Sequence, residues 1–156
     1  MTPDTLPTLG PVRKEIVVRC RLELAFEVFT ARIAEWWPLD SHSVGQAQAQ
    51  TVRLEPRVGG RLYEVCCDGS EHRWGLVTHW DPPSGFDCTW HPGREADQAT
   101  RVSLRFESAD AGTRVRLEHR GWEVLREHAE EVRAGYDGGW ATVFEELYAA
   151  AANSVA

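Results

Sequence analysis

The chain has 156 residues, of which 42% are hydrophobic and 26% charged, and its formal net charge is −7. This length is typical of one domain, and it is enough for a hydrophobic core without disulfides or metals. The acidic balance argues against a nucleic-acid partner, because a phosphate-binding face needs clustered Lys and Arg. No stretch approaches the roughly 20 apolar residues of a membrane-spanning helix, so no membrane span is expected.

The start of the chain, Met1–Pro11, contains three prolines and lacks the apolar run of a secretory signal. We interpret residues 1–12 as a flexible N-terminal tail and residues 13–152 as a single domain. None of the four cysteines has C-x-x-C spacing. They are therefore interpreted as reduced, mostly buried residues of a cytoplasmic protein.

The first part of the domain predicts a strand followed by two short helices. Arg13–Arg19 is a strand because its centre is β-branched. Helical spacing follows over Glu23–Phe29, and a second short helix over Ile33–Trp37 ends at Pro38. Leu39–Gln50 is polar and contains glycine, which predicts a loop.

The middle of the chain alternates short apolar runs with turn residues, a pattern typical of antiparallel strands. Asp68-Gly69 is a two-residue hairpin signal within this region. The predicted strands are Thr51–Glu55, Arg61–Cys67, Glu71–Trp80, Phe86–His91, Thr100–Glu107 and Thr113–His119.

Alternation along these strands predicts a sheet with one apolar face and one charged face. In the strand Arg61–Cys67, Tyr63/Val65 and Leu62/Cys66 are both acceptable inward sets, so the orientation of Glu64 stays open. The other inward sets are His72, Trp74, Leu76, Thr78 and Trp80; Phe86, Cys88 and Trp90; Val102, Leu104 and Phe106; and Val115, Leu117 and His119.

The C-terminal part returns to helical periodicity. One stripe of an amphipathic helix is formed by Trp140, Val143, Phe144, Leu147 and Ala151. Such a helix provides the apolar surface that one face of the predicted sheet needs to cover it.

Several motifs occur in a specific order along the chain. They are WWP at Trp36–Pro38, EPRVGG at Glu55–Gly60, WGLV at Trp74–Val77, WDPP at Trp80–Pro83, TWHPG at Thr89–Gly93 and GTRVRLEHRGW at Gly112–Trp122. With the order of elements, they resemble the START-like (SRPBCC, helix-grip) superfamily. Within it, the chain resembles a bacterial single-domain member of the Hsp90-ATPase-activator-homologue (AHSA1-like) group.

The resemblance implies an α+β helix-grip fold. A curved antiparallel sheet of six or seven strands would wrap around a long C-terminal helix, with two short helices after the first strand. It also implies a cavity between sheet and helix, which members of the superfamily use for lipids, hormones, polyketides or aromatic ligands. Fold alone does not set the function.

The candidate ligand-binding residues combine aromatic and polar side chains. The chain has seven tryptophans, which can form the wall of an apolar pocket or simply fill the core. His42, His119 and Tyr136 are the polar contacts that we expect in such a pocket. The full predicted set is Trp37, His42, Tyr63, Trp74, Trp90, Leu104, His119, Trp122, Tyr136 and Trp140. No catalytic residue, metal site or cofactor is assigned, because the zinc, serine-hydrolase and phosphate-loop motifs are missing.

These features favour a binding protein for a small hydrophobic or aromatic molecule. One alternative is a co-chaperone-like protein-interaction module. Another is a cyclase, dehydratase or hydrolase-type enzyme that pairs His119 with Tyr136 or Glu64 as acid and base. The ligand and any protein partner stay unidentified. The chain is expected to be a monomer or a homodimer, because an edge strand such as Thr51–Glu55 can pair with a second copy.

Overall fold

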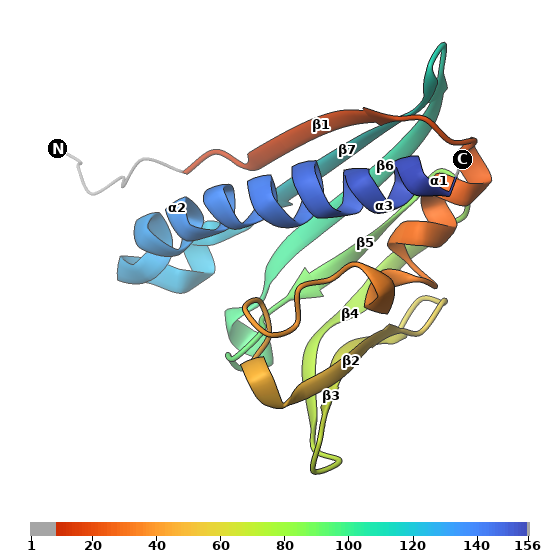
Figure 1. Cartoon of the computed structure of the whole chain (residues 1–156). Helices are drawn as coiled ribbons and strands as arrows, with labels where there is room; N and C mark the ends of the chain where they lie inside the picture. Colours follow the sequence, from red (N-terminus) through yellow and green to blue (C-terminus); the bar gives the residue numbers. More distant parts are fainter. Residues whose placement is uncertain (1–8, 156) are drawn as a thin grey trace, which may run out of the picture.

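The computed structural model describes residues 9–155, which form one antiparallel sheet and a long C-terminal helix that lies across it (Figure 1). Most of the predicted N-terminal tail therefore lies outside the described residues. The seven strands are β1 (Val12–Val18), β2 (Ala49–Leu54), β3 (Arg61–Cys66), β4 (Glu71–Asp81), β5 (Gly85–Trp90), β6 (Thr100–Ala109) and β7 (Gly112–Arg120).

The strands are ordered β1-β7-β6-β5-β4-β3-β2, and all neighbours are antiparallel. From β2 to β7 each strand pairs with the next one in the chain. The two edges of the sheet are β2 and β1, and β1 pairs with β7. The predicted helix-grip fold, with a sheet of six or seven strands, is therefore confirmed with seven.

The helices cover one face of this sheet. The two short helices expected after β1 are α1 and the single 3₁₀ turn η1. The long C-terminal helix runs through α2, η5 and α3 without a break, and α1 packs against its last part (Figure 1). The bounds are α1 (Leu22–Phe29), η1 (Ile33–Glu35), η2 (Gln46–Gln48), η3 (Ala96–Gln98), η4 (Trp122–His128), α2 (Ala129–Trp140), η5 (Ala141–Tyr148) and α3 (Ala149–Ser154).

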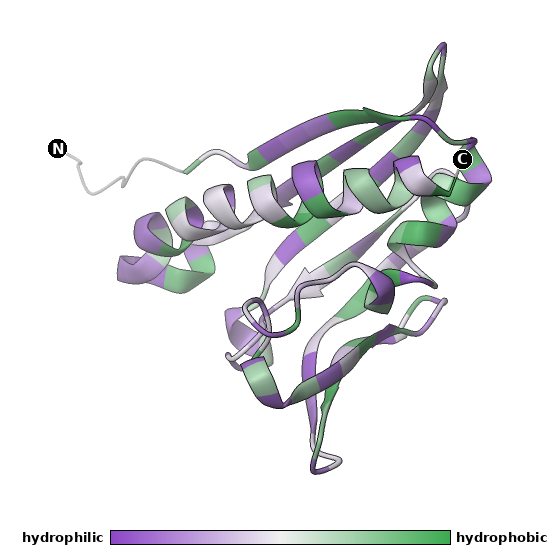
Figure 2. Cartoon of the chain, viewed as in Figure 1, coloured by the Kyte–Doolittle hydropathy of each residue, from purple (hydrophilic) through white to green (hydrophobic). Residues whose placement is uncertain are grey.

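The two faces of β6 and β7 have the predicted characters, which Figure 2 shows as alternating hydrophobic and hydrophilic bands along the strands. The inward sets that begin at Val102 and Val115 are buried against the helix. Most of the outward arginines form ion pairs instead, such as Arg116 Nε with Glu15 at 2.9 Å. Exposed pairs of this kind each add little to stability, so the apolar face dominates the fold.

The predicted alternation of β4 is wrong in its middle. The register of β4 shifts once opposite β3 and once opposite β5. As a result Val77 is buried and Thr78 exposed, the reverse of the expectation, and Leu76 is only half-buried. Beyond the second shift Trp80 faces inward again, with its ring 5.7 Å from that of Phe86. A bulge of one residue moves each following side chain to the opposite face of the sheet, and a second bulge returns the side chains to their original faces.

The predicted helical stripe is also out of phase in its last turns. Trp140 and Phe144 are buried as expected, but Tyr148 and Ala152 follow them in place of Leu147 and Ala151. The cause is η5, a stretch with wider π-helical turns, in which the amide of Ala149 donates to the carbonyl of Phe144. Wider turns place the buried positions four residues apart instead of alternating between three and four.

This phase shift predicts a ranking of two neighbouring substitutions. Tyr148 is fully buried, and its hydroxyl donates to the carbonyl of Ala25 at 2.8 Å. Tyr148→Ala should therefore lower the free energy of unfolding by about 3–5 kcal/mol. Leu147→Ala removes a side chain that is partly in water and should cost less than about 2 kcal/mol. Urea unfolding checks this, and a larger loss for Leu147→Ala would contradict the π-helical phase.

Candidate functional site

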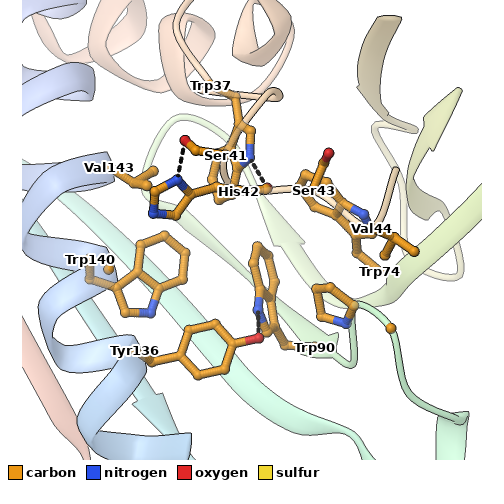
Figure 3. Close-up of a pocket in the computed structure, with 13 residues that line it drawn as sticks. Trp37, Ser41, His42, Ser43, Val44, Trp74, Trp90, Tyr136, Trp140 and Val143 are labelled. Atoms are coloured by element: carbon orange, nitrogen blue, oxygen red, sulfur yellow. Dashed lines mark hydrogen bonds between the residues drawn. The ribbon is translucent and has the colours of Figure 1, made fainter. Parts of the chain in front are cut away.

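A cavity of about 360 Å³ lies between the long helix, the sheet and the loop that follows η1 (Figure 3). Its volume falls in the range of small-molecule sites, roughly 300–1,000 Å³. The lining residues come from that loop, β4, β5, the turn after β5 and the helix: Trp37, Ser41, His42, Ser43, Val44, Trp74, Trp90, Pro92, Gly93, Tyr136, Gly139, Trp140 and Val143.

Four indole rings form the walls of this cavity. The ring centroids of Trp37 and Trp74 are 5.1 Å apart, and those of Trp90 and Trp140 are 5.3 Å apart. Trp37 also lies 5.9 Å from both Trp90 and Trp140, which joins the two pairs. Tilted and edge-to-face contacts of this kind are favourable between aromatic rings. Because all four side chains are at least nine-tenths buried, the walls are rigid.

Tyr136 supplies one polar group to the cavity. Its hydroxyl oxygen accepts the indole N–H of Trp90 at 3.2 Å (Figure 3). Burial raises the pKa of Tyr136, so the phenol stays protonated at neutral pH. Since the oxygen already accepts from Trp90, its own O–H is the donor that remains for a bound molecule.

His42 supplies the second polar group, from the loop on the other side of Trp140. Its Nδ1 lies 2.7 Å from the hydroxyl oxygen of Ser41. The other ring nitrogen points toward the space beside Trp140 and Val143 (Figure 3). An imidazole can donate or accept a hydrogen bond through its ring nitrogens.

Glu64 accepts hydrogen bonds from the loop, and its orientation, which the sequence left open, is inward. Its side chain is completely buried, and Leu62 and Cys66 on the same face of β3 are also buried. Its carboxylate accepts the amide N–H groups of Val44 at 2.7 Å and Gly45 at 2.8 Å. Glu64 is not among the residues that line the cavity.

His119 lies behind the cavity wall and holds it by hydrogen bonds. The indole N–H of Trp140 can only donate, so Nδ1 of His119, 2.9 Å away, is the acceptor. Nε2 then carries the ring proton and donates to the Thr100 hydroxyl at 2.6 Å, which in turn donates to the Trp90 carbonyl at 3.1 Å. Both tryptophans of one wall are thereby connected through a single neutral histidine.

The structure brings six of the ten predicted site residues to the cavity: Trp37, His42, Trp74, Trp90, Tyr136 and Trp140. The other four lie elsewhere. His119 is fully buried, and the ring of Trp122 lies against it at a tilt, with centroids 4.3 Å apart. Leu104 is in the core beneath the tryptophans. Tyr63 points to the other face of β3, where the guanidinium of Arg61 lies 4.1 Å from its ring centre.

Several lining residues were not anticipated from the sequence. Ser41, Ser43 and Val44 belong to a loop without periodicity, so no pattern indicates their direction. Pro92 and Gly93 belong to the turn after β5, which the sequence marks only as a chain reversal. Val143 was predicted as part of the helical stripe, but not as a cavity residue.

Two further properties concern metal sites and membrane-spanning helices. Within residues 9–155, no three His, Cys, Asp or Glu side chains are grouped so as to hold a metal ion. None of the helices described is both long and apolar enough to cross a membrane.

The family described as "Activator of Hsp90 ATPase homolog 1-like protein" matches residues 19–152. The chain belongs to this AHSA1-like family. The predicted membership of the START-like superfamily is thus confirmed. No curated protein matches the chain.

Solved structures of the same fold include the anthrahydroquino-γ-pyrone synthase Txn09 in complex with SUM. It is 34% identical, with 92% of this chain and 98% of Txn09 covered and a TM-score of 0.63. Protein MLL2253 from Mesorhizobium loti is 19% identical, with 88% and 93% covered and a TM-score of 0.62. A protein from Rhodobacter sphaeroides is 17% identical, with 96% and 95% covered and a TM-score of 0.64. The last two share the fold alone.

The buried histidine predicts a loss of stability in acid. Burial lowers the pKa of His119 from 6.5 to about 3. As the pH falls, His119 of the unfolded chain is therefore protonated near pH 6.5, whereas His119 of the folded chain is protonated only near pH 3. The free energy of unfolding falls between these values, by up to about 5 kcal/mol for the full shift.

A variant separates this effect from the titration of carboxylates. In His119→Asn the amide oxygen can replace Nδ1 as the acceptor for Trp140, but the variant cannot titrate. It should be less stable at pH 7 by a few kcal/mol, at about 1–3 per broken buried hydrogen bond. Its stability should also fall less steeply between pH 6.5 and 3 in urea unfolding. An unchanged slope would show that His119 is not buried as a neutral ring.

Proposed function

We propose that this protein binds a flat, polycyclic aromatic molecule that carries oxygen substituents. The observation that carries the proposal is the cavity itself, with four indole walls and two polar groups, His42 and Tyr136, directed into it. Rigid indoles offer faces and edges to a planar ring, and their position is fixed before binding, so little entropy is lost on ordering them.

The polar groups favour a particular set of substituents. The O–H of Tyr136 can donate to a carbonyl or quinone oxygen, because its own oxygen is already occupied by Trp90. His42, on the opposite side of Trp140, can accept from a phenolic hydroxyl or donate to a second oxygen. A purely hydrocarbon ligand would leave the O–H of Tyr136 and the second ring nitrogen of His42 without a partner inside the cavity, which is unfavourable.

The relationship to Txn09 supports the same ligand class. Txn09 is 34% identical over nearly the whole of both chains, and its name describes a fused aromatic product. The likeness is independent of the cavity geometry, and both favour a fused aromatic molecule over a flexible lipid.

The proposal is tested by comparing three probes: 1,8-dihydroxyanthraquinone, anthracene and palmitate. Quenching of tryptophan fluorescence and calorimetry should give tightest binding for the dihydroxyanthraquinone. Tyr136→Phe and His42→Ala should each weaken that complex by about 3–10-fold, the equivalent of one hydrogen bond, and leave anthracene binding nearly unchanged.

Matched controls are available on other surfaces. Tyr63→Phe alters a tyrosine on the outer face of β3, and His79→Ala alters an exposed histidine of β4. Neither should change the affinity for dihydroxyanthraquinone. Tighter binding of palmitate, or equal effects of Tyr63→Phe and Tyr136→Phe, would contradict the proposal.

A second candidate function is ring closure on such a molecule, favoured by a proton acceptor, His42, and a hydrogen-bond donor, Tyr136, at one cavity. The free nitrogen of His42 takes the proton of a phenolic hydroxyl as that oxygen bonds to the β-carbon of a conjugated ketone. The displaced electron pair moves to the ketone oxygen, which accepts the hydrogen bond of Tyr136. His42 then returns the proton to the α-carbon, so the reaction is an isomerisation that needs no cofactor.

This candidate is tested with 2′-hydroxychalcone, whose closure to flavanone is followed by absorbance. The protein should accelerate closure above the buffer rate, and His42→Ala should remove about 10²-fold or more of that acceleration. His79→Ala should retain the full rate. A rate equal to that of buffer would exclude the enzymatic candidate for this reaction and leave the binding proposal standing.

A further inference from the structure

We propose that Glu64 is a positioning residue. It fixes the loop of residues 36–45, the His42 loop, relative to the wall residue Trp74, and so determines the shape of the cavity before a ligand binds. The inference deepens the proposed function, because its effect on affinity presupposes an aromatic ligand. Its structural part, the fixing of the loop, can be measured with no ligand present.

The geometry centres on one carboxylate that is completely buried. Its Oε1 accepts the amide of Val44 and the indole N–H of Trp74, both at 2.7 Å. Its Oε2 accepts the amide of Gly45 at 2.8 Å and lies 3.6 Å from the thiol of Cys66. Among residues 9–155 no Lys, Arg or His forms an ion pair with Glu64, so neutral donors surround its carboxylate. This is costly for a carboxylate unless every oxygen is well paired.

The loop that Glu64 holds has little else to connect it to the sheet. Its internal hydrogen bonds are local: the amides of Ser41 and His42 both donate to the carbonyl of Pro38. The indole of Trp37 donates to the carbonyl of His42 at 2.8 Å, which fixes the start of the loop. At the other end, Val44 and Gly45 are attached to Glu64. His42 therefore sits between two anchors, and Glu64 is the one that belongs to the sheet.

The same carboxylate also determines where one cavity wall stands. Trp74 is the wall residue beside Val44 of the loop (Figure 3), and the only polar atom of its side chain, Nε1, donates to Glu64. Loop and wall thus share one acceptor, so their relative position depends on a single group. A cavity fixed in this way loses little entropy on binding.

Two features of the sequence are explained by this arrangement. A carboxylate only accepts hydrogen bonds, whereas the amide of Gln would turn an NH₂ group toward one of the donors. Gly45 is needed because a Cβ at this position would lie 2.5 Å from the Cys66 sulfur and 3.1 Å from Oε2 of Glu64. The loop can therefore approach the carboxylate only when residue 45 has no side chain.

The test uses Glu64→Gln and Gly45→Ala, which disturb the same contact from the two sides. Hydrogen exchange of the intact protein, without ligand, should be about tenfold or more faster at the amides of Val44 and Gly45 in both variants. Core amides of β6 and β7 should keep their wild-type rates. The indole N–H of Trp74 should also exchange faster in Glu64→Gln.

The affinity for 1,8-dihydroxyanthraquinone should fall about fivefold or more in both variants. Glu107→Gln, which removes an exposed carboxylate, and Gly138→Ala, at an exposed helical glycine with open space around it, serve as controls and should change neither measurement. Because a buried substitution can impair folding, Gly45→Ala keeps the test possible if Glu64→Gln does not fold.

The outcomes separate this inference from the proposed function. If exchange at residues 44 and 45 is unchanged, or if core amides accelerate equally, Glu64 does not specifically position the loop and the inference is wrong. If the exchange result is as expected but the wild-type protein binds no aromatic probe, the ligand class is wrong and the loop anchor stands. If the probe binds equally well to all variants while the loop exchanges faster, preorganisation by Glu64 is refuted.

Discussion

The structure depends on one constraint: the apolar face of a seven-stranded sheet must be covered by a single helix. A helix with its side chains is about 10–12 Å across, which is narrower than a sheet of seven strands. At the β1 end the helix and α1 together cover the sheet, with Phe29 and Tyr148 in contact. Toward β3 and β4 the remaining gap is spanned by a loop and by indole rings, and the cavity is what these groups leave open.

Two buried polar groups inside this apolar layer, His119 and Glu64, each hold an indole ring by a hydrogen bond. His119 holds Trp140 and, through Thr100, the strand of Trp90. Glu64 holds Trp74 and the loop. Both are surrounded by neutral hydrogen-bonding partners, so each is stable only while its partners stay in position. The cost of burying them is the physical reason to regard the cavity as a formed site and not as a packing defect.

The sequence predicted the features that depend on regular periodicity. The inward sets of β6 and β7 follow from alternation, and the helix-grip architecture was expected from the resemblance of the motifs and the order of elements to a known superfamily. The predictions failed where the period changes locally, at the two register shifts of β4 and in the π-helical turns that bury Tyr148 in place of Leu147. A bulge or a π turn is determined by tertiary packing, and a single sequence contains no separate signal for it.

The site was predicted in the same uneven way. The structure puts aromatic residues of regular strands and helices, such as Trp90 and Trp140, at the cavity, because parity decides on which face they lie. Their role in binding stays a prediction. Strand parity also put His119 on the inward face, but it could not tell a residue that lines a cavity from one that lies behind its wall. Ser41, Ser43 and Val44 lie on a loop whose direction is decided by a long-range contact with Glu64, and Glu64 itself lay on a strand of ambiguous parity.

The distribution of apolar surface favours a small ligand over a protein partner. Among residues 9–155, the large hydrophobic side chains that are exposed are Val17, Val44, Val58 and Val124. They come from β1, the His42 loop, the turn before β3 and η4, so they form no common patch, whereas a docking surface for a protein usually needs one. Val44 also borders the aromatic cavity. The concentration of aromatic groups in this molecule is inward, around a space of small-molecule size.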